Sequence, residues 1–435
     1  MGQYDRKAQS QRKHGPLTVS GASKAPVVPP TGRPGWKGPS YVKKRPSRNS
    51  SVPTPPATVT QAQLLPVELQ QLALNIFYDT FPVAKDFESL KPTLQEVNDA
   101  LACKDRDRAF GSEDYRDAYA VRWSPSRALT YANVLAWICN EKCREERWVE
   151  CFSNNKDDWR DAEPRSNETA RVVCFGGGAA EIMAFAALSR YQRPDESGVP
   201  SQESQEVANV DSSGTVKTPT RLHATSRPSS PVLDLHLVDT PDWTRVISDL
   251  QSYLETPPVL SKYASATARA NNAAFLSSGA IRPRFTQLNM LDLSTDALRA
   301  IVASEPTLFT FFFSLQELSS TSVPKATALL RKITAAAPRD SLLLILESPG
   351  AHVEISTGNS ESTADVLDES RSCPINWLND RILLQKPLSK TEGEETTALW
   401  QKVLDEESRQ HKLDVKLRYP ALENMKFQLQ LYKRI

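Results

Sequence analysis

The sequence predicts an α/β protein with a mostly parallel central sheet, and two observations support this prediction. Short apolar runs alternate with segments of helical periodicity, as in sheets whose strands are joined by covering helices. The chain then ends in two segments of strict apolar–polar alternation, which indicate an antiparallel hairpin. Its 435 residues allow roughly two to four domains and can bury a sizeable core.

Residues 1–63 have a composition of their own. They hold eleven lysines and arginines against one acid, Asp5, which gives this segment a net charge of +10, while the whole chain has +1. They also hold many prolines and lack apolar periodicity, so burial cannot offset the entropy of ordering. We therefore predict a disordered basic tail. Lys43-Lys44-Arg45-Pro46 is either a nuclear localisation signal or part of a solvated tail, and the charge asymmetry suggests a polyanionic partner.

Residues 64–150 predict a small helical region of three or more helices. Four apolar residues recur at helical spacing near its start: Leu65, Leu69, Leu72 and Ile76. Thr93 and Glu96 match a capping box, and Ser124-Pro125 matches the start of a later helix.

Residues 168–435 predict the α/β domain. Apolar runs predict five strands, over 171–175, 232–238, 285–291, 308–313 and 342–346. Helical patterns between them cover 179–189, the segment from Trp243 to Leu250, 296–303 and 325–336. Residues 191–230, rich in Ser, Pro, Gln and Glu, predict a disordered insertion. The hairpin is expected from the alternating segments 413–417 and 425–431, with a short loop between them.

Several classes of protein are disfavoured. No stretch approaches the roughly 18 apolar residues that span a bilayer, so we expect no membrane segment. The six cysteines form no C-x-x-C pair, and the five histidines have no matching partners, so we expect reduced thiols in a soluble intracellular protein without a metal site.

Three consecutive glycines, Gly176, Gly177 and Gly178, follow the first predicted strand and open a helix. Glycine lets the backbone turn sharply and approach a ligand, with helix N–H groups pointing at it, although a purely structural turn is the alternative. The dinucleotide fingerprint would require glycine where Glu181 stands, and no Gly-Lys-Ser/Thr of a P-loop follows.

Acids end the next two predicted strands. Without the insertion, Asp239 lies about twenty residues beyond the glycines, where an acid binds the ribose hydroxyls of a nucleoside. Asp292 ends the third predicted strand and is a candidate acceptor for an adenine amino group. The alternative for either acid is that it caps the helix that follows it.

Three blocks resemble a known family: Tyr119–Ala128, Val172–Glu181 and Leu417–Phe427. They are similar to the fungal large-subunit (25S) ribosomal RNA uridine-N3 methyltransferases, over residues 64–435 except 191–230 and much of 350–395. The resemblance implies a class I, Rossmann-like methyltransferase sheet with a C-terminal antiparallel hairpin, S-adenosylmethionine as the methyl donor, and N3 of one uridine in 25S rRNA or a pre-60S particle as the acceptor. We also expect a monomer, located in the nucleus or nucleolus, in the cytoplasm, or in both.

The sequence departs from the general methyltransferase motif at two positions. Cys174 stands where an acid often ends the first strand and holds the methionine amino group, and Ala180 replaces the last glycine. These departures keep a second interpretation open, a non-catalytic ribosome assembly factor with a degenerate methyltransferase fold. A Rossmann oxidoreductase is a further alternative.

In this fold the methyl acceptor binds beyond the end of the fourth predicted strand. Ser314 is a candidate cofactor contact there, and Glu317 is a candidate base for the uridine imide, the alternative being an exposed carboxylate at a helix start. Arg122, Trp123 and Arg127 combine charge with an aromatic ring, which suits RNA phosphates and bases. A packing tryptophan flanked by surface arginines is the competing interpretation.

Overall fold

The computed structural model describes residues 58–142, 148, 169–192, 232–302, 304–356, 370–385 and 399–435. Residues 56–435 belong to one compact unit. The predicted basic tail up to residue 57 and residues 193–230 of the predicted insertion lie outside the described residues.

An eight-stranded sheet forms the centre of this unit, in the order β1-β9-β10-β6-β5-β2-β3-β4. Its strands are β1 (Val59–Thr60), β2 (Thr169–Phe175), β3 (Val232–Asp239), β4 (Ile281–Gln287), β5 (Thr307–Phe312), β6 (Leu342–Glu347), β9 (Trp400–His411) and β10 (Met425–Arg434). Neighbours from β4 to β6 pair in parallel, whereas β10 lies antiparallel between β6 and β9. A separate antiparallel pair joins β7 (His352–Ser356) and β8 (Ser370–Pro374). This topology confirms the predicted sheet with its C-terminal antiparallel hairpin.

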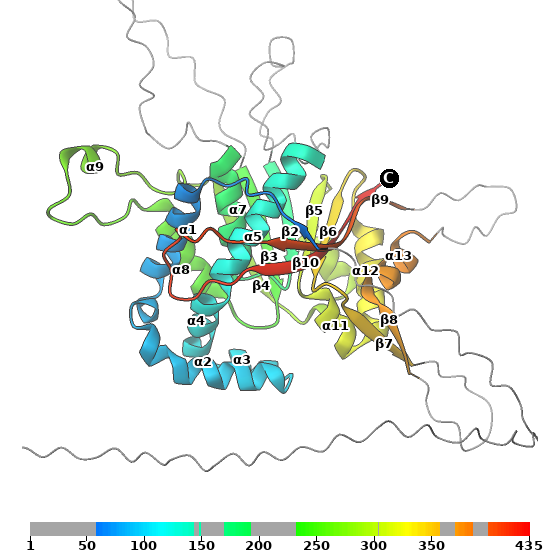
Figure 1. Ribbon diagram of the computed structural model, residues 1–435. Coiled ribbons are helices and arrows are strands. Elements are labelled where there is room, and N and C mark those ends of the chain that lie inside the picture. The colour runs from blue at the N-terminus through cyan, green and yellow to red at the C-terminus, as the bar shows by residue number, and fades with distance from the viewer. Residues whose placement is uncertain are drawn as a thin grey trace, which may run out of the picture. The chain divides into compact units, whose positions relative to one another are not determined.

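Helices cover both faces of the sheet (Figure 1). The N-terminal ones are α1 (Val67–Thr80), α2 (Phe87–Ala102), α3 (Arg106–Phe110), α4 (Glu113–Arg122) and α5 (Ser124–Trp137), which ends in a π-helical turn, Ile138–Lys142. Those between strands are α7 (Ala179–Gln192), α8 (Thr244–Glu255), α9 (Ala266–Ala270), α10 (Thr295–Ile301), α11 (Leu315–Thr321), α12 (Val323–Ala336) and α13 (Ile375–Leu383). Short 3-10 turns span Pro82–Lys85 and Met290–Asp292.

Alternation along the central strands divides the core into two layers. Val172 and Cys174 of β2 point into a cluster with helices α1, α5, α7 and α8, while Val173 and Phe175 point into a cluster with α10, α12 and α13. Both faces are buried, which explains why these strands read as continuous apolar runs. Helix α7 is apolar on nearly every side because it packs between the sheet and the N-terminal helices.

The hairpin prediction was wrong about its first strand. That strand is β9, residues 400–411, and the alternating segment 413–417 lies in the connection to β10, where Val415 is 92% exposed. Strand β9 was not predicted because its sequence is rich in charged residues. The segment 413–417 was predicted wrongly because alternation alone does not distinguish a strand from an extended loop. The tail is also shorter than predicted, since Val59 and Thr60 pair with β9 and Gln61 donates from its backbone to Gln410 O.

The boundaries of two other elements, a helix and a strand, differ from the prediction. Thr93 lies inside α2, whose N-cap is Asp86, with a side chain that accepts from Ser89 N, so the predicted capping box is absent. The third strand is β4, residues 281–287, earlier than the predicted 285–291, and a 3-10 turn reaches Asp292.

Candidate active site

A cavity of about 800 Å³ lies at the carboxyl ends of β2, β3, β5 and β6. Strand β2 pairs with β3 on one side and with β5 on the other, so the strand order reverses direction here. In open α/β sheets ligands bind at this crevice, because the loops on either side of it diverge. Residues of α3, α4 and α5 form the opposite wall.

The glycine turn lines the cavity through Gly176 and Gly178. Gly176 has φ +83°, and a Cβ at this position would lie 2.6 Å from Ser314 Cβ, so both conformation and space require glycine. Gly177 is explained by packing instead, because its Cβ would lie 2.7 Å from Cys174 Cβ. Gly178 lies against the Trp243 indole, which a Cβ would approach to 3.2 Å.

The turn after β5 meets the glycine turn directly. Phe313 has φ +58°, which is rare for a residue with a side chain, and the strand accordingly ends at Phe312. The sharp turn brings Ser314 to β2, where its hydroxyl donates to Phe175 O at 2.8 Å. Ser314 therefore joins the two loops and lines the cavity beside Gly176.

Asp239 ends β3 and is only 4% exposed, yet it lines the cavity. Its carboxylate accepts from Trp243 Nε1 at 3.0 Å and from Thr240 N at 2.8 Å. Burial raises the pKa of Asp239, and the Arg106 guanidinium partly offsets the effect of burial. The carboxylate is held rigidly, as an acceptor for a ligand's hydroxyl groups requires.

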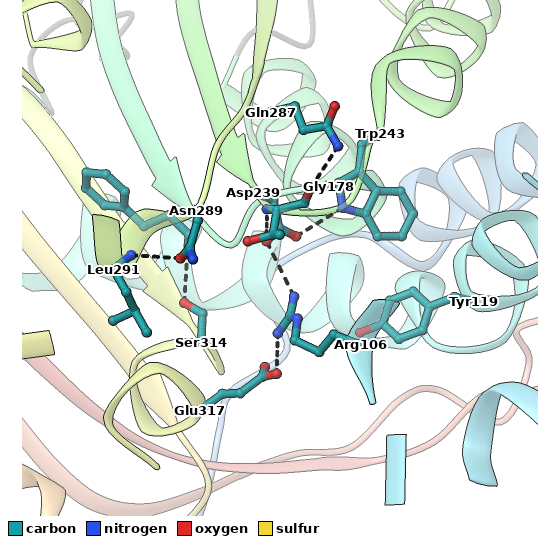
Figure 2. A network of polar contacts seen from close by, with 12 residues as sticks. Arg106, Tyr119, Gly178, Asp239, Trp243, Gln287, Asn289, Leu291, Ser314 and Glu317 are labelled. Carbon is teal, nitrogen blue, oxygen red and sulfur yellow. Dashed lines mark hydrogen bonds and ion pairs between the residues drawn. The ribbon is translucent and has the colours of Figure 1, made fainter. Parts of the chain in front are cut away.

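Arg106 of α3 is a site residue that the sequence analysis missed. Its guanidinium lies 3.4 Å from Asp239 Oδ1 and also forms an ion pair with Glu317 (Figure 2). Glu317, on the first turn of α11, lines the cavity with a 45% exposed side chain. The structure thus brings together the predicted ribose acid and the predicted base.

Two buried glutamates also line the cavity, Glu181 and Glu347. Glu181 accepts from Gly178 N at 2.7 Å, and burial raises its pKa to about 7. Glu347 ends β6 and accepts from Gln316 N at 2.9 Å, and burial raises its pKa to about 8. Their signal was available in the sequence, since one follows the glycines and the other ends an apolar strand.

A cluster of aromatic rings, which includes Trp243 beside Gly178, lines the cavity. Tyr119 packs against three rings, with centroid distances of 5.0 Å to Phe110, 5.1 Å to Trp123 and 5.8 Å to Trp243. Arg127 lies over the Tyr119 ring and donates to its hydroxyl group. Trp123 and Arg127 also line the cavity.

Two predicted site residues do not line the cavity. Arg122 pairs with Glu423, in the connection between β9 and β10, and stacks over Trp123 at 5.6 Å. Asp292 is exposed, accepts from Asn289 and pairs with Lys325 Nζ at 2.7 Å. Neither is among the residues that line the cavity, so the structure does not bring them to the cofactor crevice.

Among the described residues, no group of three or more histidines, cysteines and acids is placed to bind a metal ion. Within the same part of the chain, no helix is both long and apolar enough to cross a membrane.

The strand order, with an antiparallel strand inserted near one edge and a glycine turn and acid at the crevice, defines a class I methyltransferase fold. Residues 77–433 match the model of the family described as "Putative SAM-dependent methyltransferase". The chain belongs to this family, and its methyl donor is S-adenosylmethionine. This membership sets aside the oxidoreductase alternative.

One relative is the 25S rRNA (uridine(2843)-N(3))-methyltransferase of Saccharomyces cerevisiae, 26% identical over 377 residues, or 86% of each chain. An O-methyltransferase family protein from Burkholderia thailandensis has a TM-score of 0.31 and 11% identity, covering 83% of this chain and 72% of its own. A mutant of the 16S rRNA (adenine(1408)-N(1))-methyltransferase from Catenulisporales acidiphilia has a TM-score of 0.28 and 11% identity, covering 66% of this chain and 92% of its own. Scores this low do not establish a common fold, which rests on the strand order.

The cavity fits the cofactor that the family uses. Its volume of about 800 Å³ lies within the range of small-molecule sites. Gly176 and Gly178 bring bare backbone to its floor, and Asp239 offers a buried carboxylate for a ribose diol. These three residues are the ones we expect to hold S-adenosylmethionine.

Proposed function

We propose that the protein methylates N3 of a uridine in large-subunit ribosomal RNA. The observation that carries this proposal is the similarity to the yeast 25S rRNA uridine-N3 methyltransferase over 86% of both chains. The arrangement of the cavity supports it, because the glycine turn and Asp239 fit a nucleoside cofactor, while Glu317 and the aromatic rings of the N-terminal helices line the same cavity.

The chemistry requires one proton transfer. S-adenosylmethionine supplies an electrophilic methyl group on a sulfonium. Uridine N3 is a weakly acidic imide, so it must lose its proton as its lone pair attacks the methyl carbon and the C–S bond breaks. Glu317 is our candidate for the acceptor of that proton, since its carboxylate is the half-exposed one next to Asp239.

The remaining residues orient the acceptor. Trp123 and Tyr119 offer ring faces on which a base extruded from its helix can stack, and Arg127 adds a positive charge beside them. Arg122 is proposed to bind phosphate at the rim, after exchanging Glu423 for the RNA. The basic tail is proposed to add non-specific phosphate contacts or to direct nuclear import.

The test is to incubate the purified full-length chain with labelled S-adenosylmethionine and large-subunit rRNA from a strain that lacks the gene. We expect mass spectrometry of the digested rRNA to detect 3-methyluridine at one nucleotide, and the same nucleoside to disappear from rRNA when the gene is deleted. Methyl transfer to another atom would overturn the acceptor assignment. If no label is transferred although the cofactor binds, the non-catalytic assembly factor becomes the better interpretation.

A further inference from the structure

The residue at position 174 cannot balance the positive charge on the amino-acid end of the cofactor. The amino-acid end of S-adenosylmethionine carries an ammonium group, and this fold usually meets it with an acid at the end of the first central strand. Here that position holds Cys174, which is 1% exposed and packs in the hydrophobic core. Burial raises the pKa of the Cys174 thiol well above its ordinary value, so it stays neutral and cannot balance the ammonium charge.

Glu181 brings a carboxylate to the same place from the next helix. It lines the cavity, is 5% exposed, and is close enough to Cys174 for its charge to raise the pKa of that thiol further. We propose that Glu181 replaces the missing strand-end acid and binds the ammonium group of S-adenosylmethionine. The inference rests on the assignment of this cavity to the cofactor.

The contacts of Glu181 leave it able to accept a cation. Among the described residues, Gly178 N is the only group of another residue that donates a hydrogen bond to it, and no lysine or arginine forms an ion pair with it. Arg127 acts on it through space but donates to Tyr119 instead. A carboxylate this deeply buried is costly to ionise without a cation, and a bound ammonium group would remove that cost.

The surrounding charges agree with this role. Arg127 and Tyr131 face Glu181 from α5, and Asp239 faces it from β3. Arg127 favours the ionised carboxylate, whereas Asp239 opposes it, and burial dominates both. A cationic ligand group would reverse this balance.

The competing explanation is that Glu181 only caps α7. A glutamate at the third helical position that accepts from the N-cap amide is one half of a capping box, and glutamine serves equally there. Glu181→Gln therefore keeps the cap and removes the charge, which separates the two explanations. Glu347→Gln is a matched control, because it removes another buried carboxylate from the same cavity.

The experiment measures binding by calorimetry to full-length wild-type, Glu181→Gln and Glu347→Gln proteins. The two ligands are S-adenosylhomocysteine, which keeps the amino-acid end, and 5′-methylthioadenosine, which lacks it. We expect Glu181→Gln to weaken S-adenosylhomocysteine binding about tenfold or more, as for a lost charge-assisted hydrogen bond, and to change 5′-methylthioadenosine binding less than about twofold. Glu347→Gln should not discriminate between the ligands.

Equal losses for both ligands, or no loss for either, would overturn the ammonium assignment and leave the cap as the role of Glu181. If wild-type protein bound neither ligand, the assignment of the cavity to the cofactor would fail instead. Thermal unfolding of each variant shows whether the fold is intact. A Glu181→Gln protein that failed to fold would also count against the proposal, because the cap should survive this substitution.

Discussion

Arg106 Nη2 lies 3.4 Å from Asp239 Oδ1, and the same guanidinium pairs with Glu317. One side chain therefore connects the acid proposed to bind the cofactor ribose with the acid proposed as the base (Figure 2). In the sequence, Arg106 and Asp239 are 133 residues apart. The relationship makes the ionisation of Asp239 depend on Arg106, which can be measured.

Replacing Asp239 tests the cofactor site itself. Asp239→Asn keeps an acceptor for Trp243 and removes the charge, so we expect S-adenosylmethionine binding to weaken by about 1–3 kcal/mol, since the ribose hydroxyls lose a charged acceptor. Calorimetry measures this loss. Asp242→Asn, an exposed acid three residues further along, is the control and should bind normally. Unchanged affinity in Asp239→Asn would remove Asp239 from the site.

Replacing Arg106 tests its influence on Asp239. Burial raises the pKa of Asp239 and Arg106 lowers it, so Arg106→Gln should raise that pKa further. A protonated Asp239 accepts hydroxyl groups poorly. We therefore expect the variant to lose more S-adenosylhomocysteine affinity at a pH of about 5.5 than at a pH of about 8, measured by calorimetry. Arg108→Gln, an exposed arginine of the same helix, should match wild type, and equal losses at both pH values would contradict the coupling.

Replacing Glu317 tests the proposed base. We expect Glu317→Gln to lower kcat about 100-fold or more while cofactor affinity is retained, because the imide proton loses its acceptor. The pH–rate profile should also become flatter. Steady-state methylation of rRNA measures both, with Glu354→Gln as the control because that exposed glutamate lines the same cavity. Wild-type turnover would leave alignment and spontaneous imide ionisation as the mechanism.

Glu347 should make stability fall as the pH rises. Its pKa is about 8 in the folded protein and about 4.3 in an unfolded chain, so between these values the native state binds more protons. The contribution of Glu347 to the free energy of unfolding is thus present at low pH and is lost as the pH rises through about 8. Glu347→Gln should raise the melting temperature relative to wild type at alkaline pH and much less at a pH of about 5. A difference independent of pH would contradict this assignment.

The basic tail should act only on RNA binding. Removing residues 1–55 leaves β1 in place, and we expect unchanged folding and S-adenosylmethionine affinity. Affinity for rRNA should fall, and the slope of log affinity against log salt should become shallower, because fewer counterions are released. Filter binding across a salt series measures both. Equal slopes, with mislocalisation of the truncated chain in cells, would favour an import signal in Lys43–Arg45.

The central fold was predictable because burial on both faces gives the inner strands a distinctive apolar composition. Strands β2, β3, β5 and β6 were predicted to within two residues at each end. Strand β9 was missed because its charged residues resemble a surface loop, while 413–417 alternates without pairing. Alternation reports which side a residue faces, but pairing depends on a partner strand that the sequence does not identify.

The cavity was predictable in part for a related reason. Gly176, Asp239 and Ser314 follow strands, and parallel strands bring their carboxyl ends to one edge. Arg106 belongs to a five-residue helix that is far from these strands in the sequence, and only tertiary packing places it beside Asp239. Asp292 illustrates the converse, since the turn before it directs its carboxylate to Lys325 rather than into the cavity.

The contact between Gly176 and Ser314 has a mechanical consequence. Gly176 has no Cβ, so Ser314 packs directly against it, and the Ser314 hydroxyl donates to Phe175 O. The loops after β2 and β5 are therefore held together. The two loops cannot separate without breaking this contact. We therefore expect any change in the width of the cavity to come from the opposite wall, the N-terminal helices, where Arg106 and Tyr119 lie.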